Sequence, residues 1–284
     1  MAAPSLSLPS ATELLAVCAH PDDESFGLGG VLRAYVERGT CVRVLCLTHG
    51  EASTLGDTAR PLAEVREDEL AAAARVLGVT AVRLHDYPDG RLADIPLETL
   101  SARVDAEVTS PALLIAFDEG GITGHPDHVR ATQAALAVAA QRRLPVLGWA
   151  LPQEVTAQLN AEYGTAFVGR LSEELDFTLE VDRALQREAI ACHSSQSGEN
   201  PVLWRRLELL GASEHLRWLL PPPGGEVTRT ERAELLRGAS RTGVAPATPA
   251  SLMDTAAGVI PWPGTPQGFE EHQHPHETPV PPAR

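Results

Sequence analysis

Residues 13–48, ELLAVCAHPDDESFGLGGVLRAYVERGTCVRVLCLT, contain the pattern that determines the fold class. Glu13–Ala19 and Cys41–Thr48 are short apolar runs typical of buried strands. The longer periodic stretch Ser25–Arg38 predicts a helix that ends at Gly39. A strand, a helix and a second strand in this order form a right-handed crossover, which makes the two strands parallel.

The same alternation continues along the chain to about residue 151. It predicts further strands at Ala81–Asp86, Ala112–Phe117 and Val146–Leu151, and helices at Leu62–Leu77, Pro96–Val108 and Asp127–Arg142. Beyond this point the pattern is less regular and predicts strands at Leu175–Val181 and Glu214–Leu220 and a helix at Arg183–Cys192. We therefore expect an α/β, Rossmann-like three-layer fold with a mostly parallel sheet.

The composition changes near residue 221. The last 64 residues hold 12 of the 23 prolines and few large apolar side chains. Such a segment buries too little apolar surface to offset the entropy lost on ordering. We expect one Rossmann-like metal-dependent domain over residues 1–221, followed by a Pro/Ala-rich tail over residues 222–284 that is mostly disordered, with one short helix near Thr230–Arg237.

Charge and cysteine content exclude several classes of function. The 284-residue chain has a formal net charge of −15, and all 23 basic residues are arginines, so a lysine base, a Schiff base and a P-loop lysine are excluded. An acidic chain does not suit nucleic acid or an anionic membrane. The four cysteines, Cys18, Cys41, Cys46 and Cys192, form no CxxC pair. With no leader-like N-terminus and no apolar run of ~18 residues, a cytoplasmic protein is expected.

Polar and ionisable residues follow four of the predicted strands. They are residues 20–24 (HPDDE), 49–51 (HGE), 87–90 (YPDG) and 118–128 (DEGGITGHPDH). Because ligands bind at the carboxyl ends of the strands in open parallel sheets, these segments predict the functional site. An Asp at a helix start is also a common N-cap, which is the competing interpretation of each His-Pro-Asp segment.

Two imidazoles and one carboxylate in these segments suit a divalent metal ion. We expect His20, Asp23 and His128 to bind Zn²⁺, and Fe²⁺ also suits this set of ligands. Pro21 restricts the turn after His20, so that Asp22 points differently from Asp23 and stays free as a general base.

A second histidine precedes His128 by three residues. His125 is expected to face the same site without binding the metal. Asp127 lies close enough in sequence to orient His125 and to support its charged form. Together with Asp22, these two residues complete the predicted catalytic set.

The motifs AHPDDE at residues 19–24 and GHPDH at residues 124–128 resemble the paired signatures of the PIG-L/LmbE-like N-acetylglucosaminyl deacetylases. This family includes the sugar deacetylases of mycothiol and bacillithiol synthesis, and the resemblance covers about residues 13–220. It implies the same three zinc ligands and Asp22 as the base. It also implies that His125 stabilises the oxyanion and that Asp127 orients His125.

Five further residues have less specific signals. Arg66, Asp89 and His193 are candidates for substrate binding, although Arg66 also suits a solvated helix surface, Asp89 a tight turn and His193 a helix cap. Glu24 is expected to accept a hydrogen bond from a metal-ligating histidine. His85 lies inside a predicted strand and is expected to be structural.

The leading function is a metal-dependent hydrolase that removes acetyl from an N-acetylglucosamine-type sugar, with a metal-bound water as nucleophile. An amidase acting on a thiol-sugar conjugate would use the same site. A non-haem Fe(II) oxygenase shares the ligand set. The non-enzyme alternative is a nucleotide- or sugar-binding Rossmann-like module. A small amino-sugar is the expected partner, and the sequence leaves the aglycone, the metal and a homo-oligomeric state open.

Overall fold

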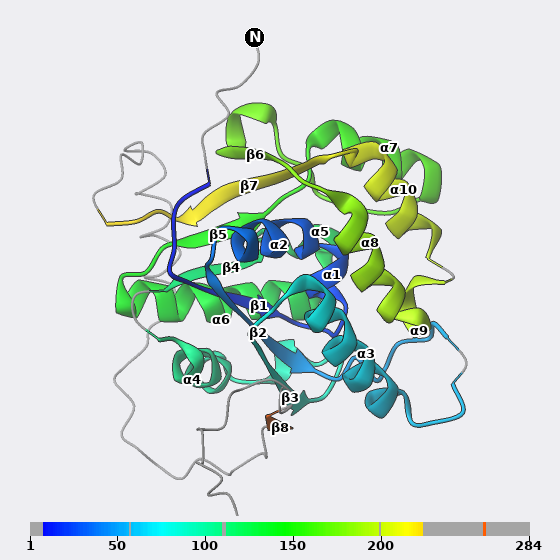
Figure 1. Cartoon of the computed structure of the whole chain (residues 1–284), viewed down its shortest axis with the longest axis horizontal. Helices are drawn as coiled ribbons and strands as arrows, with labels where there is room; N and C mark the ends of the chain where they lie inside the picture. The colour runs from blue at the N-terminus through cyan, green and yellow to red at the C-terminus, as the bar shows by residue number, and fades with distance from the viewer. Residues whose placement is uncertain (1–7, 57, 110–111, 199, 224–257, 260–284) are drawn as a thin grey trace, which may run out of the picture.

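A computed structural model describes residues 8–56, 58–109, 112–198, 200–223 and 258–259 (Figure 1). The strands are β1 (Glu13–Cys18), β2 (Cys41–Thr48), β3 (Ala81–Tyr87), β4 (Leu113–Phe117), β5 (Val146–Trp149), β6 (Phe177–Glu180), β7 (Ser213–Leu220) and β8 (Gly258–Val259). The helices are α1 (Asp23–Phe26), α2 (Gly29–Glu37), α3 (Leu62–Leu77), α4 (Leu97–Glu107), α5 (Gly121–Gly124), α6 (Pro126–Arg142), α7 (Gln153–Tyr163), α8 (Arg183–Cys192), α9 (Ser194–Ser197) and α10 (Pro201–Leu210). Two short 3-10 turns, η1 (Leu92–Asp94) and η2 (Ser172–Glu174), complete the described elements.

The strands form one sheet in the order β6-β7-β5-β4-β1-β2-β3-β8. Strands β1 to β5 are mutually parallel, whereas β6, β7 and β8 pair antiparallel with their neighbours. The predicted α/β fold with a mostly parallel sheet is confirmed. The chain leaves β1 towards β2 on one side and later returns to β4 on the other, so the strand order reverses between β1 and β4. Such a reversal opens a crevice at the carboxyl ends of these two strands.

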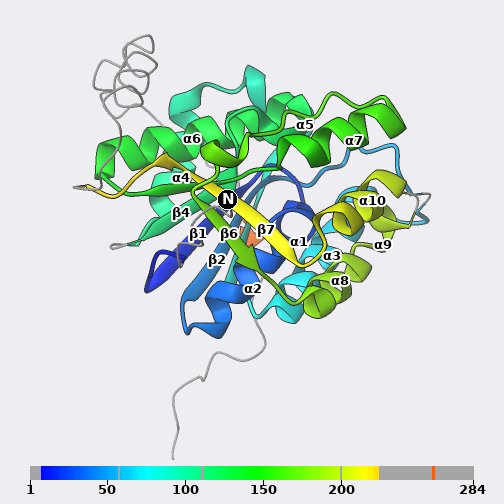
Figure 2. The ribbon, with the colours of Figure 1, turned by 90° about the horizontal axis from the view of Figure 1, so that it is seen from above.

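Helices cover both faces of the sheet, as Figure 2 shows from above. Side chains along β1 alternate between the two faces, because successive residues of a strand point in opposite directions. Leu14 and Ala16 pack with apolar residues of α2 and α3, whereas Leu15 and Val17 pack with those of α4 and α6. The result is two apolar layers, and burial on both faces explains the continuous apolar run in β1.

The structure divides one predicted helix in two. The stretch Ser25–Arg38 was expected to be continuous, but α1 ends at Phe26 and α2 begins at Gly29. A Cβ atom at Gly27 would lie 2.6 Å from the ring of Phe117, so the backbone approaches β4 closely at this break. Helices α7 and α10 lie in the part of the chain where the sequence pattern was too irregular to interpret.

The strands β1 to β7 all lie within residues 13–220, and we propose that residues 1–221 form the domain. Gly258–Val259 adds the short strand β8 to the edge of β3. Residues 224–257 and 260–284 of the predicted tail, including the helix expected near Thr230–Arg237, lie outside the described residues. The structure describes all four cysteines, and each is a free thiol. No helix in the described ranges is long and apolar enough to cross a membrane.

His85 in β3 is buried, and its environment makes stability depend on pH. Burial lowers the pKa of His85 to about 4, with help from the nearby Arg103 and Arg83 charges. The unfolded chain therefore takes up a proton near pH 6.5, whereas the folded chain does so only near pH 4. We expect the contribution of His85 to stability to be complete above pH 6.5 and to be lost as the pH falls to 4. Between pH 6.5 and pH 4, the stability of His85→Leu, measured by thermal unfolding, should fall less than that of the wild type. Equal falls would contradict the prediction.

Candidate metal centre

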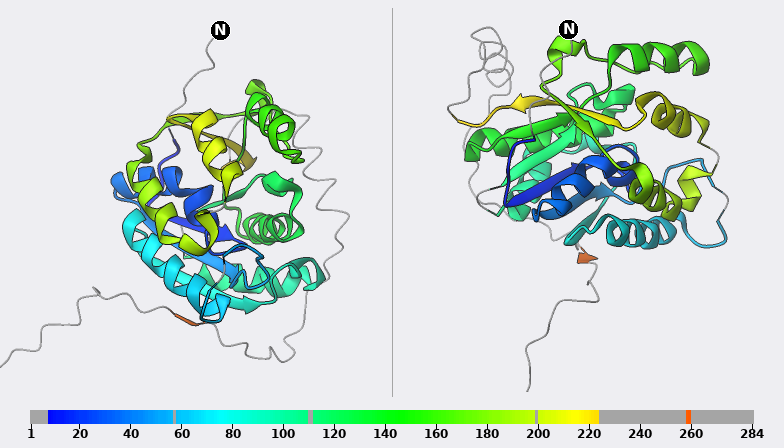
Figure 3. Two further views of the ribbon diagram at one scale, coloured as in Figure 1. Left: turned by 90° about the vertical axis from the view of Figure 1, so that its right-hand side faces the viewer. Right: turned by 45° about the horizontal axis from the view of Figure 1, so that its top comes forward.

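The two His-Pro-Asp segments meet at the carboxyl ends of β1 and β4, which are neighbours in the sheet. Residues 20–24 continue from β1 into α1, and residues 125–128 lead from α5 into α6. The left view of Figure 3 looks onto this edge, where the short helices α1 and α5 lie. The predicted rim is therefore the place where the chemically unusual side chains gather.

The three predicted metal ligands form one tight group. His20 Nδ1 lies 3.1 Å from His128 Nε2, and His128 Nε2 lies 3.1 Å from Asp23 Oδ1. His20 Nδ1 lies 4.0 Å from Asp23 Oδ2. Ligand atoms of a tetrahedral zinc ion, with bonds of ~2.0–2.2 Å, are separated by about 3.3 Å. Two of these spacings are close to that value, and the three residues offer ligand atoms that all lie within 4.8 Å of one another.

Acidic side chains determine which nitrogen of His20 carries the proton. Nε2 lies 3.0 Å from Asp89 Oδ1 and 3.5 Å from Asp127 Oδ2, so a lone pair on Nε2 would face two carboxylates. In the neutral imidazole, the form that binds a metal, the proton therefore belongs on Nε2, and Nδ1 presents its lone pair to the ligand group. Burial acts to lower the pKa of His20, but the carboxylates of Asp127 and Asp89 outweigh it and raise the pKa to about 10. A metal ion at this site would compete with a proton.

His128 is oriented in the same way from the other side of the group. Its Nδ1 lies 3.1 Å from the carbonyl oxygen of Gly121, so Nδ1 donates and Nε2 carries the lone pair. Two imidazole lone pairs and a carboxylate thus converge on one point. Such donors repel one another unless a cation lies between them, and their chemistry suits Zn²⁺ or Fe²⁺.

Asp23 is held by the turn after β1. Its Oδ2 accepts hydrogen bonds from the backbone N–H groups of Ala19, at 2.9 Å, and His20, at 3.0 Å, which leaves Oδ1 facing His128. Burial acts to raise the pKa of Asp23, but the adjacent His128 imidazole outweighs it, and the pKa lies below its ordinary value. The side chain is therefore an anionic donor.

The carboxylate of Asp22, the predicted base, lies against Arg66. Its backbone has φ 129° and ψ −24°, which is a costly conformation for a residue with a side chain. Its Oδ2 accepts a hydrogen bond of 2.8 Å from Arg66. Burial raises the pKa of Asp22 to about 6, even though the Arg66 guanidinium acts to lower it. A carboxylate with a pKa near neutrality suits a general base.

Arg66 is neither a solvated surface residue nor an exposed substrate contact, because only 3% of it is accessible. Its guanidinium donates to Asp22 and to the carbonyl oxygens of Gly50 and Pro21. Gly50 has φ +64°, and a Cβ atom there would overlap Arg66 Nη1. Arg66 therefore holds the Asp22 carboxylate, and its role in substrate binding stays a prediction.

Glu24 and His193 also differ from expectation. Both are fully buried, and His193 Nε2 lies 2.7 Å from Glu24 Oε1. The other oxygen of Glu24 accepts from the backbone N–H of Asp22 at 3.0 Å. Glu24 therefore supports His193 and Asp22 rather than a metal-ligating histidine. The backbone of His193 forms the C-cap of α8, and its role in substrate binding stays a prediction.

His125 forms the N-cap of α6, and its Nδ1 accepts from the backbone N–H of Asp127 at 3.2 Å. Its remaining nitrogen, Nε2, must then carry a proton that it can donate. Burial, together with the His20 and His128 charges, lowers the pKa of His125, so the neutral form is favoured. The Asp127 carboxylate acts in the expected direction, towards the charged form of His125, but burial outweighs it.

The Asp127 carboxylate instead accepts from the backbone N–H groups of Gly90, at 2.8 Å, and Leu92, at 3.0 Å, and faces His20. Asp89 also faces His20, and its Oδ2 accepts from Ala52 N–H at 3.0 Å. It is therefore more than the simple turn residue that the Pro-Asp-Gly sequence favoured. Both carboxylates fix the orientation of His20.

The sequence and the fold of the chain are similar to those of known proteins. The family model of PIG-L, GlcNAc-PI de-N-acetylase, matches residues 15–139. A protein of Rhodococcus erythropolis, named 1D-myo-inositol 2-acetamido-2-deoxy-alpha-D-glucopyranoside deacetylase, is 33% identical over 199 residues, which are 58% of this chain and 68% of that protein. The chain belongs to the PIG-L family.

Two further comparisons place this PIG-L chain among its relatives. A deacetylase of the same name from Kineococcus radiotolerans is 36% identical over 182 residues, which are 50% of this chain and 49% of that one. The chain thus matches about half the length of that relative. The crystal structure of N,N'-diacetylchitobiose deacetylase from Pyrococcus horikoshii has a TM-score of 0.52 and 21% identity, and covers 74% of this chain and 84% of its own. This likeness shows that the fold is shared.

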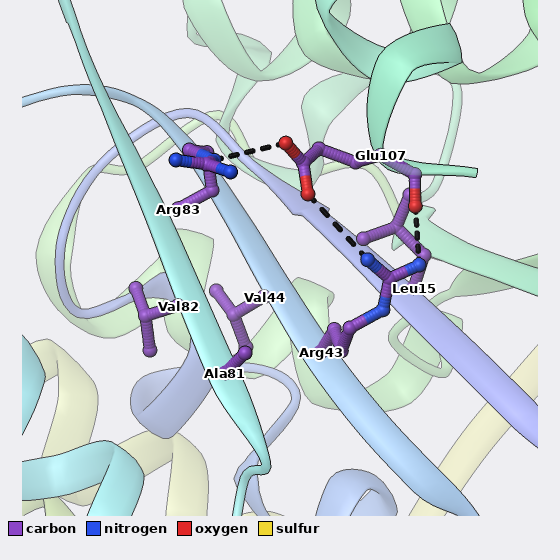
Figure 4. A pocket seen from close by; sticks show the side chains of 7 residues that line it. All are labelled: Leu15, Arg43, Val44, Ala81, Val82, Arg83 and Glu107. Carbon is purple, nitrogen blue, oxygen red and sulfur yellow. Dashed lines mark hydrogen bonds and ion pairs between the residues drawn. The ribbon is translucent and has the colours of Figure 1, made fainter. Parts of the chain in front are cut away.

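A small pocket of the PIG-L chain lies away from this centre, at the amino ends of β1 to β3 (Figure 4). Glu107, at the end of α4, lines this pocket and forms ion pairs with Arg83 at 2.9 Å and Arg43 at 3.5 Å. The charged groups there are paired with one another, and none of them belongs to the predicted site.

Sequence reasoning missed Gly121, whose carbonyl oxygen orients His128. A backbone contact depends on conformation and leaves no characteristic residue type in the sequence. The available signal was the glycine itself, because Gly121 has φ +65° and a Cβ atom there would lie 3.0 Å from His128 Cβ.

Proposed function

We propose that the chain is a metal-dependent hydrolase that removes the acetyl group from an N-acetylglucosamine-type sugar or glycoside. The observation that carries the proposal is the convergence of His20 Nδ1, Asp23 Oδ1 and His128 Nε2, with Asp22 free beside them. Membership of the PIG-L family and the deacetylase names of the relatives support the choice of reaction and substrate.

The ligand group would hold Zn²⁺, and Fe²⁺ fits the same donors. When bound, the metal supplies Lewis acidity, which lowers the pKa of water from 15.7 towards ~7. His20, Asp23 and His128 are the residues that would hold it. Outer carboxylates and the Gly121 carbonyl keep the two imidazoles in the required tautomers.

The chain's own groups supply the proton transfers. Asp22 accepts the proton of the attacking water, and Arg66 keeps the Asp22 carboxylate in place. His125 Nε2–H donates to the oxyanion that develops on the acetyl oxygen. Preorganised donors of this kind are each worth ~10²–10³ in rate. Protonated Asp22 then returns a proton to the departing amine.

An amine-release assay tests the proposal. The full chain would be stripped with a chelator, reloaded with Zn²⁺ and offered a panel of N-acetylglucosaminides, including the inositol glycoside named for the relatives. We expect equal amounts of acetate and free amine, loss of activity with chelator, and recovery with Zn²⁺. A zinc-loaded chain that releases amine from no acetylated sugar would contradict the function, and release confined to thiol-sugar amides would favour the amidase alternative.

A further inference from the structure

The segment that follows β4 controls one of the proposed metal ligands. Residues 118–124 run from the end of β4 through α5 to the start of α6. Within this segment Gly121 supplies the carbonyl oxygen that accepts from His128 Nδ1 at 3.1 Å. Thr123 Oγ1, at 3.5 Å, and the Phe117 ring also contact the His128 ring, but the Gly121 carbonyl is the nearer acceptor for Nδ1–H, so a shift of this carbonyl would alter the direction of the Nε2 lone pair.

The backbone of this segment is strained. Ile122 has φ 60° and ψ −57°, a conformation that β-branched residues rarely adopt, and its side chain is buried. Strain of this kind persists only where surrounding contacts impose it. The position of the Gly121 carbonyl therefore depends on contacts from outside the segment.

Arg170 and Arg217 supply two of these contacts, both to Asp118. Asp118 is 2% exposed, and its Oδ2 accepts from Arg170 Nε at 2.5 Å while its Oδ1 accepts from an Arg217 guanidinium N–H at 3.0 Å. Arg217 lies on β7, and Arg170 follows α7. The Asp118 backbone carbonyl accepts from the N–H of Gly121 at 2.7 Å, so the clamped residue is bonded to the one that orients His128.

The segment that contains Arg170 is itself held in place by backbone hydrogen bonds. Arg170 N–H donates to the carbonyl of Leu151, and its own carbonyl accepts from Gln153 N–H. Two residues earlier, Val168 N–H donates to the carbonyl of the strained Ile122 at 3.1 Å. Residues 168–170 thus contact residues 118–122 twice, through Val168 and Ile122 and through Arg170 and Asp118.

We propose that Asp118, clamped by Arg170 and Arg217, is a positioning residue that sets the metal affinity of the site through Gly121 and His128. Asp118 is buried, so it acts through the backbone. The proposal rests on the proposed function for the identity of the metal site. Partners that orient metal-ligating histidines typically change metal affinity by ~10–100-fold when they are replaced.

The test measures zinc affinity by competition with a chromophoric chelator, using full-length chains that are folded by circular dichroism. Asp118→Asn keeps the shape of the side chain but loses the charge that holds both arginines. We expect its affinity for Zn²⁺ to fall by ~10-fold or more. Asp105→Asn, which breaks an exposed ion pair with Arg142 on α4 and α6, is the matched control and should leave the affinity unchanged.

Cobalt provides a second readout that depends on geometry rather than on stability. The visible absorption of Co²⁺-loaded Asp118→Asn should differ from that of the wild type, and Gly121→Ala should show a change in the same bands. An Asp118→Asn affinity within twofold of wild type, with an unchanged Co²⁺ spectrum, would overturn the clamp. If Asp118→Asn does not fold, Arg170→Gln and Arg217→Gln, each of which removes the charge of one arginine that holds Asp118, decide by the same criteria. A wild-type chain that binds no Zn²⁺ would instead overturn the metal dependence itself.

Discussion

Replacing Asp22 by Asn should separate metal binding from catalysis. Asn has nearly the same shape and can still accept the hydrogen bond from Arg66, but it cannot take a proton from water at neutral pH. General-base assistance is typically worth ~10²–10⁴ in rate, and deacetylation should fall by that factor. Zinc content should stay near the wild-type value, because Asp22 is not among the three converging donors. Steady-state kinetics and metal analysis of the same preparation provide the two measurements.

Asp86→Asn is the matched control for this substitution. Asp86 lies near the carboxyl end of β3, and its side chain contacts the imidazole of His49 at 2.9 Å. This side chain is 55% exposed and lies outside the ligand group. We expect its activity to remain close to wild type. If Asp22→Asn keeps most of its activity, Asp22 has no role as a base. If it loses zinc, Asp22 belongs among the metal ligands.

Replacing any one of His20, Asp23 and His128 should lower the rate of deacetylation by at least the same factor. An Ala substitution leaves two protein ligands, too few for tight binding of a divalent ion. The loss of zinc affinity should exceed the ~10–100-fold expected for residues that only orient a ligand. Metal analysis after dialysis should show zinc in the wild type and little in each variant, with activity lost in parallel.

His49→Ala serves as the control, since it removes a rim histidine that lies outside the group. It should retain zinc. Full occupancy in Asp23→Ala would remove Asp23 from the ligand set. Combined with a loss of zinc in Asp22→Asn, that result would exchange the roles of the two adjacent aspartates.

The sequence by itself determined the parallel part of the sheet and the edge that carries the site. The predicted and observed bounds agree for β2 and α3, because a glycine or a change of period marks each end of these elements. Two His-Pro-Asp segments, each after a buried strand, had to meet at one edge once the strands were parallel. That argument needs only local patterns and the rule for right-handed crossovers.

Only the tertiary structure decided what the individual polar side chains contact. The local pattern of Arg66 suited a helix surface, yet its side chain contacts Asp22. The side chain of His193 contacts Glu24, and that of Asp89 contacts His20. All three partners are distant in sequence. Long-range packing also broke the helix at Gly27, beneath Phe117. Contacts of this kind depend on the relative positions of whole elements, and a buried charge adopts whichever partner those positions supply, because leaving it unpaired costs far more than any local preference.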